Sequence, residues 1–214
     1  MEMGAPSIDG DNPEGDPMKI AFVTGGNRGI GLASARRLAH DCGHVVITSR
    51  DAAAGEDAAD RLRREGYAVT SLQMDVTDET SVKIAAGIVG GSWGTGSGTS
   101  SCSSTTPVNV STTMGSLADQ TNPDSPYLSL VVPAYQSSKA ALNNVTITLA
   151  KQLAVSSIKV TSVCPRFVRT DLAPAAAEAP LAPEDAAEVV YRAATLPDSA
   201  ASGTFVDAQG AVPW

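Results

Sequence analysis

The sequence predicts an α/β fold with a doubly wound parallel sheet, because short apolar runs alternate with segments of helical periodicity along most of the chain. Strand–helix–strand units of this kind give a parallel sheet with helices on both faces. The predicted strands are residues 19–24, 45–49, 67–74, 108–111, 158–164 and 204–207, and the predicted helices are residues 28–41, 52–65, 78–89, 134–154 and 183–196.

The first three helices are predicted from the spacing of their apolar residues and from the glycines that follow them. Gly43 and Gly66 are the expected stops of the first two helices. The strands expected between these helices are residues 45–49 and 67–74. The positions expected to face inward are Ile30, Leu32, Ala35 and Leu38 in helix 28–41, and Val82, Ala85, Ala86 and Val89 in helix 78–89.

The second half of the chain resumes the same alternation after an irregular segment. The long helix 134–154 carries Leu142, Val145, Leu149 and Leu153, and helix 183–196 begins with Pro183 and acids in its first turn. Residues 90–107 do not fit, because they form a linker rich in Gly, Ser and Thr. Such a linker is unusual in the middle of a compact α/β domain.

Length and composition bound the class of protein. The 214 residues suit one domain, which we expect over residues 18–214 behind a mobile tail over 1–17. The net charge of −8 argues against nucleic acid or an anionic membrane as partner. Neither a signal peptide nor a transmembrane run is apparent.

The three cysteines, Cys42, Cys102 and Cys164, fit neither a disulfide framework nor a zinc site. This predicts a cytoplasmic protein with no metal centre, and the sequence leaves the oligomeric state open.

A glycine-rich turn joins the first predicted strand to the first predicted helix. It reads Thr24-Gly25-Gly26-Asn27-Arg28-Gly29-Ile30-Gly31. Gly25 permits a tight turn, Gly29 lets the backbone approach a diphosphate, and Gly31 lets helix and strand pack closely. The N–H donors and the positive potential of the helix N-terminus favour a phosphate at this point.

These residues match T-G-x-x-x-G-[IL]-G throughout, and in them the chain resembles the short-chain dehydrogenase/reductase family. The resemblance implies a Rossmann-like domain that binds a nicotinamide cofactor. The residues that it assigns to the cofactor in this turn are Gly25, Asn27, Arg28, Gly29, Ile30 and Gly31.

The second predicted strand ends at Arg50, where NAD enzymes usually have an acid for the ribose 2′-hydroxyl. Arg50 and Arg28 suit a 2′-phosphate instead, which predicts NADP(H). Asp51 is the alternative, as a ribose-binding acid. The resemblance further implies that Asp75 and Val76 meet the adenine, unless Asp75 only caps the next helix.

Tyr135 and Lys139 lie four residues apart and therefore on one face of the helix 134–154. An ammonium beside a phenol favours phenolate, so we expect a lowered pKa for Tyr135. The segment from Tyr135 to Asn143 resembles the active-site helix of the family. The resemblance implies that Tyr135 exchanges a proton with the substrate oxygen while a hydride moves.

The family holds the substrate oxygen with the second serine of an N-V-S-S segment. This chain has Asn109-Val110-Ser111-Thr112, so Thr112 or its neighbour Ser111 would take that role, unless both are ordinary strand-end hydroxyls. Pro165 and Thr170 match a family pattern near the nicotinamide. Arg166 replaces the glycine of that pattern, at a cost if the backbone needs a positive φ there.

The insert between Thr112 and Tyr135 and the ending from Gly203 to Trp214 resemble the monomeric carbonyl reductase branch of the family. The expected function is NADP(H)-dependent reduction of a ketone or aldehyde to an alcohol. The alternatives are a non-catalytic nucleotide-binding remnant and an unstable product of a faulty gene.

A central strand four, ending in N-N-A-G in the family, and the helix after it are missing or replaced. Too few residues precede the strand 108–111 for the parallel crossover that they would need. Without this strand the sheet closes up by about 4.8 Å or leaves unpaired backbone. We therefore expect weak or absent turnover and low stability.

We hypothesise that a shift of reading frame produced the odd segment. GC-rich codons for Leu-Val-Leu-Val-Asn-Asn-Ala, read one base later, encode Ser-Cys-Ser-Ser-Thr-Thr-Pro, which is residues 101–107. The alternative is a natural Ser/Thr linker. Sequencing the gene tests this: codons 101–107 should spell the N-N-A strand in the neighbouring frame, and any other codons there would refute the shift.

Overall fold

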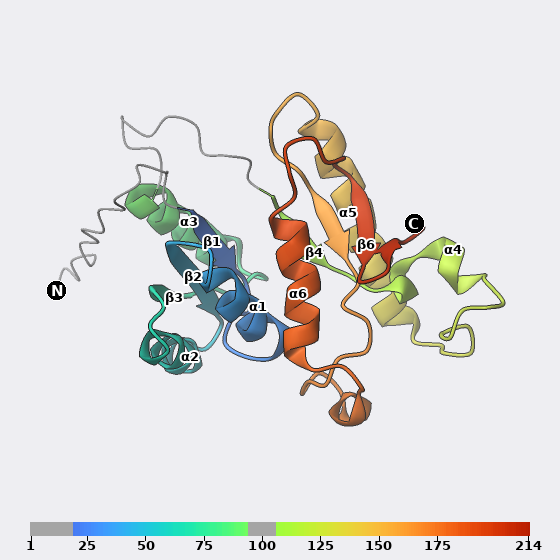
Figure 1. Cartoon of the computed structure of the whole chain (residues 1–214), viewed down its shortest axis with the longest axis horizontal. Helices are drawn as coiled ribbons and strands as arrows, with labels where there is room; N and C mark the ends of the chain where they lie inside the picture. Colours follow the sequence, from blue (N-terminus) through green and yellow to red (C-terminus); the bar gives the residue numbers. More distant parts are fainter. Residues whose placement is uncertain (1–18, 94–105) are drawn as a thin grey trace. The chain divides into compact units, whose positions relative to one another are not determined.

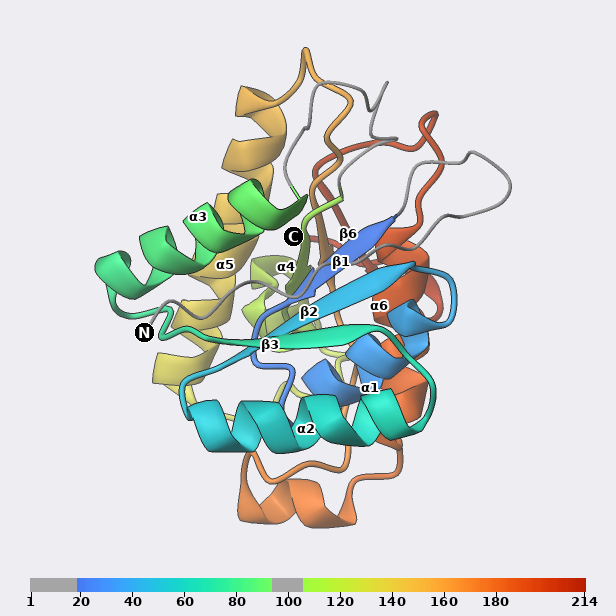
Figure 2. The ribbon, with the colours of Figure 1, turned by 90° about the vertical axis from the view of Figure 1, so that its left-hand side faces the viewer.

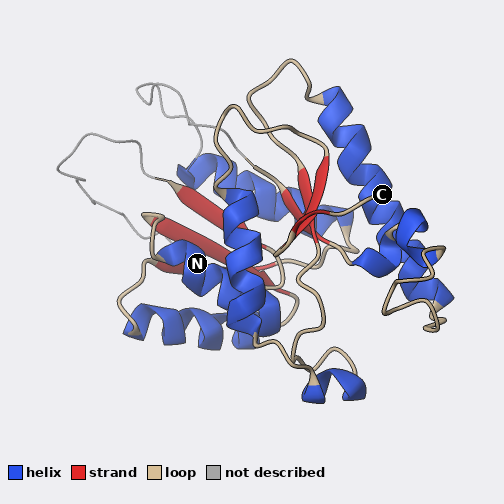
Figure 3. Ribbon diagram, turned by 45° about the vertical axis from the view of Figure 1, so that its right-hand side comes forward, coloured by secondary structure: helices blue, strands red, loops and turns tan. Residues whose placement is uncertain are grey.

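The computed structural model describes residues 19–93 and 106–214. The chain divides into two compact units, residues 1–102 and residues 103–214. The first unit holds a three-stranded sheet and the second a four-stranded sheet (Figure 3). The expected tail 1–17 and residues 94–105 of the expected linker lie outside the described residues.

The first unit alternates strands and helices, and its sheet is wholly parallel in the order β1-β2-β3. The central strand β2 is buried along its whole length. Helices α1 and α2 cover one face of the sheet and α3 lies on the other (Figure 2). The elements are β1 Ile20–Val23, α1 Gly29–Ala39, β2 His44–Ser49, α2 Ala52–Arg64, β3 Val69–Gln73 and α3 Glu79–Trp93.

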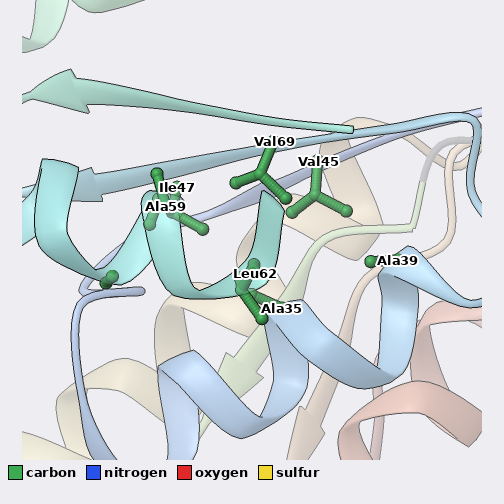
Figure 4. Packing of buried hydrophobic residues seen from close by; sticks show 8 residues of the cluster. Ala35, Ala39, Val45, Ile47, Ala59, Leu62 and Val69 are labelled. Atoms are coloured by element: carbon green, nitrogen blue, oxygen red, sulfur yellow. The ribbon is translucent and has the colours of Figure 1, made fainter. Parts of the chain in front are cut away.

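The core of the first unit lies between this sheet and the helices α1 and α2 (Figure 4). Side chains alternate across a strand, so Val45 and Ile47 of β2 face the same side. Leu62 of α2 packs against them, and all three are 0% exposed. Alanines of both helices, among them Ala35 and Ala59, allow the helices to lie close to the sheet.

The second unit continues the alternation with shorter strands. Its sheet has the order β4-β5-β6-β7, in which the first three strands are parallel and β7 is antiparallel. Helix α6 covers one face of this sheet and α5 the other (Figure 1). The elements are β4 Val108–Val110, η1 Thr113–Gly115, α4 Leu117–Gln120, α5 Pro133–Gln152, β5 Thr161–Val163, η2 Pro174–Glu178, α6 Pro183–Ala194, β6 Thr204–Asp207 and β7 Gly210–Ala211.

A partly buried chain of polar side chains ties α5 to this sheet. The amide of Asn109 donates to the hydroxyl of Thr146 at 2.8 Å, and that hydroxyl lies 2.8 Å from the hydroxyl of Ser162. Because each buried group has a partner, the chain fixes the rotation of α5 about its axis. No helix in the described ranges has the length and apolar content to cross a membrane.

The strands and helices expected from the sequence are all present, with shifted ends. The third helix continues through residues 90–93, which we expected in the linker. Glycines lower helix propensity there, but unlike proline they leave the backbone hydrogen bonds possible. Of the face expected to point inward, Ala85 is buried and Val82 is 36% exposed.

Leu62→Ala is expected to lower the free energy of unfolding of the first unit by about 2–5 kcal/mol, because it leaves a cavity at a fully buried site. Urea denaturation followed by circular dichroism measures the change. Ile84→Ala is the matched control, since Ile84 is 59% exposed. Equal losses for the two variants would contradict this account of the core.

Candidate functional site

The glycine turn between β1 and α1 has the backbone shape that only glycine adopts readily. Gly25 has φ +65° and Gly29 has φ +56°. A Cβ on Gly25 would meet nothing within 4 Å, so the space beside it is open. Helix α1 begins at Gly29, and no acidic residue lies in its first turn. The positive end of α1 is therefore available to an anion.

Two close contacts make the turn compact. A Cβ on Gly31 would overlap the carbonyl oxygen of Gly25, and a Cβ on Gly26 would lie 2.7 Å from Cβ of Ile47. The N–H of Gly26 also donates to the carbonyl of Thr48 at 3.0 Å. Gly26 was not singled out in the sequence, although it is the second of the paired glycines. Asn27 and Ile30 are half-buried within the same turn.

Asp51 is occupied as a helix cap. Its Oδ1 accepts the N–H of Ala53 at 2.9 Å and the N–H of Ala54 at 3.1 Å at the start of α2. Arg50, directly before it, is exposed. Arg28 is the residue before α1, with an extended backbone. The strand end therefore presents the cation of Arg50, while the neighbouring acid serves α2.

Asp75 lies at the end of β3 and does not cap α3. Its Oδ1 accepts the N–H and the hydroxyl of Thr77, and these bonds lower the pKa of its carboxyl. The charge of Arg50 acts in the same direction, so the two side chains are near each other. Asp78 instead accepts the N–H of Thr80 in the first turn of α3. Val76 is 65% exposed beside Asp75.

In the second unit, Tyr135 and Lys139 share one face of α5. Lys139 Nζ lies 5.8 Å from the ring centroid of Tyr135 and donates to the carbonyl of Val110 at 2.8 Å. This bond joins α5 to the last residue of β4. A Cβ on Gly115 would lie 2.8 Å from Cβ of Lys139, so η1 packs closely against the same turn of α5.

The pKa of Tyr135 shifts in the direction opposite to the expected one. Burial raises it, and the nearby Cys164 adds to the shift. Burial also lowers the pKa of Lys139. The expectation failed because the ammonium donates to Val110 and lies over the ring face. Tyr127, which the sequence did not single out, is also near Cys164, and burial raises its pKa too.

The two candidate hydroxyls beside this pair differ in access. Ser111 is 3% exposed, and its hydroxyl has no hydrogen-bond partner within the described residues. Thr112 is partly exposed, and its oxygen accepts the N–H of Met114 at 3.3 Å. That bond orients the Thr112 oxygen and leaves its O–H available to donate.

Arg166 has φ +63° and is the sole non-glycine residue with a positive φ in 19–93 and 106–214. The backbone therefore does need a positive φ at this position, where arginine is costly and glycine is not. Its guanidinium contacts Asp207 Oδ2 at 2.6 Å and Gln209 Oε1 at 2.6 Å. Pro165 is buried. Thr170 lines an open hollow of about 490 Å³ next to Arg169.

The residues assigned to the cofactor's diphosphate, ribose and adenine thus lie in the first unit. The proton-transfer residues, with Pro165 and Thr170, lie in the second unit. Within each unit the assigned residues come together at the ends of parallel strands, where ligands of such sheets bind.

A sequence profile of the family described as short chain dehydrogenase matches residues 19–95 and 125–180, which is more than half of the chain. The chain belongs to the short-chain dehydrogenase family. The interval 96–124, which contains most of the odd segment, is not matched. The doubly wound α/β fold predicted from the sequence is confirmed.

Individual relatives agree with this family. Carbonyl reductase [NADPH] 3 of Homo sapiens is 46% identical over 66 residues, which is 30% of this chain and 24% of the relative. The aligned regions span about a quarter to a third of the length of the curated relatives.

Solved structures share the fold. Salutaridine reductase from Papaver somniferum has a TM-score of 0.71 at 22% identity, over 87% of this chain and 99% of that one. The NADPH bound carbonyl reductase from chicken fatty liver has a TM-score of 0.71 at 18% identity, over 92% of this chain and 99% of that one.

Arg166→Gly is expected to have opposite effects in two backgrounds. Alone it lowers the free energy of unfolding by about 1–2 kcal/mol, because the Asp207 side chain is 6% exposed and loses its cation. In an Asp207→Asn background it raises stability by about 1 kcal/mol, because the left-handed strain is relieved and the remaining loss is the exposed bond to Gln209. Urea denaturation measures both. Stabilisation in both backgrounds would show that the ion pair contributes nothing.

Proposed function

We propose that this chain is an NADP(H)-dependent oxidoreductase that reduces a ketone or aldehyde. In this proposal the first unit binds the nucleotide and the second supplies the proton. The observation that carries the proposal is the Tyr135–Lys139 pair on α5, tied to β4 by the 2.8 Å bond to Val110. Membership of the short-chain dehydrogenase family supports it.

The glycine turn fits a dinucleotide. A diphosphate suits the open space at Gly25 and the positive end of α1. Val76 offers an exposed apolar side chain to an adenine, and Arg50 a cation to a 2′-phosphate. When bound, NADPH would supply the hydride. The choice of NADP(H) is supported by the capping role of Asp51, which leaves Arg50 as the group for the ribose, and by the relative named as an NADPH carbonyl reductase.

The residues of α5 and β4 account for the proton. Tyr135 donates its phenolic proton to the carbonyl oxygen as that oxygen gains negative charge. Thr112 donates a second hydrogen bond to the same oxygen, and its partly exposed side chain makes it a better candidate than the buried Ser111. Lys139 fixes this part of α5 to β4 through its bond to Val110. Its ammonium lies 5.8 Å from the ring centroid of Tyr135.

Tyr135 is protonated at neutral pH, because burial raises the pKa of its phenol. The protonated phenol is the form that reduction of a carbonyl requires.

We further propose that a strand and a helix have been replaced in the interval that the family profile does not match. Among the described residues, β1 pairs with β2 alone and β4 with β5 alone, so each is an edge strand of its sheet. Helix α3 also exposes Ile84 and Ile88, at 59% and 42%, as a helix lacking a neighbour would. These observations favour a second candidate function, a nucleotide-binding remnant with little or no turnover.

Thermal melts with NADPH and with NADH test the nucleotide site. At about 100 times the dissociation constant, NADPH should stabilise the folded protein by about 2.7 kcal/mol and NADH by less. Arg50→Ala should weaken NADPH binding about tenfold and leave NADH unchanged. Arg64→Ala, which removes another exposed arginine of the same unit, is the control. Absence of any shift would refute the nucleotide site.

Oxidation of NADPH with a panel of ketones and aldehydes separates the enzyme from the remnant. The enzyme predicts turnover that falls by at least about a hundredfold in Tyr135→Phe, while the NADPH-induced shift in melting is unchanged. The remnant predicts the melting shift without turnover. Turnover that survives Tyr135→Phe would overturn the assignment of the acid.

A further inference from the structure

The hairpin formed by β6 and β7 continues into Trp214, which folds back onto the sheet. The Trp214 ring stacks on Phe205 of β6, with centroids 5.4 Å apart and planes at 25°. Phe205 is 2% exposed, so this contact anchors the segment in the core of the second unit. The N–H of Val212 also donates to the carbonyl of Phe205 at 2.8 Å.

Trp214 is bonded to the loop that precedes α5. Its carbonyl accepts the N–H of Ala118 in α4 at 3.1 Å, and the end of the chain lies beside α4 (Figure 1). From there Asp119 Oδ2 accepts the hydroxyl of Ser125 at 2.8 Å, and Ser125 Oγ accepts the N–H of Tyr127 at 3.2 Å.

The same chain of bonds reaches α5. The N–H of Leu130 donates to the carbonyl of Tyr127 at 2.9 Å, and the Gln136 amide donates to the carbonyl of Leu130 at 3.3 Å. Gln136 adjoins Tyr135. The loop 121–132 is thus held at one end by Trp214 and at the other by the helix that carries the phenol.

The hairpin holds the loop after β5 as well. Asp207 and Gln209 both bond the guanidinium of Arg166, and the N–H of Cys164 donates to the carbonyl of Val206 at 2.8 Å. Cys164 and Arg166 both influence the pKa of Tyr127, which places Tyr127 near this loop. One hairpin therefore fixes two loops near the Tyr135 phenol.

We propose that Trp214 and Asp119 are positioning residues that hold the loop 121–132, with Tyr127, as a wall of the substrate site. The inference rests on the proposed carbonyl reduction. The part of the loop before Tyr135 has no charged side chain from Ser125 to Ala134. Leu128 and Val131 are 48% and 77% exposed, so the wall suits the apolar part of a substrate.

Two substitutions that each remove one link of the same chain of bonds test the proposal. Trp214→Ala removes the stack that fixes the Trp214 carbonyl, and Asp119→Ala removes the acceptor of Ser125. Each should raise amide exchange in residues 125–130 by about tenfold or more, while the amides of β5 are unchanged. Since the links act in series, the double variant should exchange no faster than the single variants. Hydrogen exchange read by mass spectrometry measures this.

Steady-state kinetics distinguish a role in substrate positioning from a purely structural role, because only the former changes KM while kcat stays nearly constant. Both variants should raise KM for an apolar ketone about fivefold to tenfold and change kcat less than about twofold. Trp214→Phe, which retains a stacked ring, should restore KM. Phe22→Ala, an aromatic truncation in the first unit, is the control for general loss of stability and should leave exchange in 125–130 unchanged.

Unchanged exchange in residues 125–130 of both variants would overturn the proposal. Faster exchange with an unchanged KM would overturn the role in substrate positioning. A wild-type chain that binds NADPH but reduces nothing would refute the proposed function, and the exchange measurements alone would then decide whether Trp214 holds the loop.

Discussion

Parallel strand pairing is the constraint on which the rest of this structure depends. A parallel strand must be reached by a crossover, and it needs a hydrogen-bonded neighbour on each side to be central. In the first unit the crossovers through α1 and α2 each return to the adjacent strand, and β2 is fully buried as a result. The strands β1 and β4 have one partner each among the described residues. Phe22 on β1 is 42% exposed, as is typical of an edge.

Local signals predicted the elements well because each element is set by its own residues. Helix α2 is an example. Asp51 accepts two N–H groups at its start, and Gly66 takes φ +96° just after its end. The sequence therefore predicted both ends of this helix. The end of α3 was not, because Gly90 and Gly91 indicate a linker by composition. The hairpin to β7 was also missed, since two residues, Gly210 and Ala211, carry too little pattern to predict a strand.

The placement of Tyr135 and Lys139 on one face of a helix was predicted from the sequence, and the electrostatics of the pair were not. The spacing of Tyr135 and Lys139 is a property of one helix, and the structure reproduces it. The pKa of Tyr135 depends on burial and on Cys164, which is 29 positions away in the sequence. The bond from Lys139 to Val110 likewise joins segments that only the fold brings together. The pKa shift and the bond both depend on tertiary packing, which cannot be read from the periodicity of the sequence.

Arg166 shows how a local defect and its compensation arise together. A left-handed arginine costs about 1–2 kcal/mol, yet its guanidinium satisfies the almost buried carboxylate of Asp207. The same ion pair connects the β6–β7 hairpin to the loop after β5. A glycine would remove the strain and the connection at once. Arg166 is therefore compatible with the proposed function, in which the reacting groups must be held closely in place. Its replacement by glycine would not simply repair the backbone.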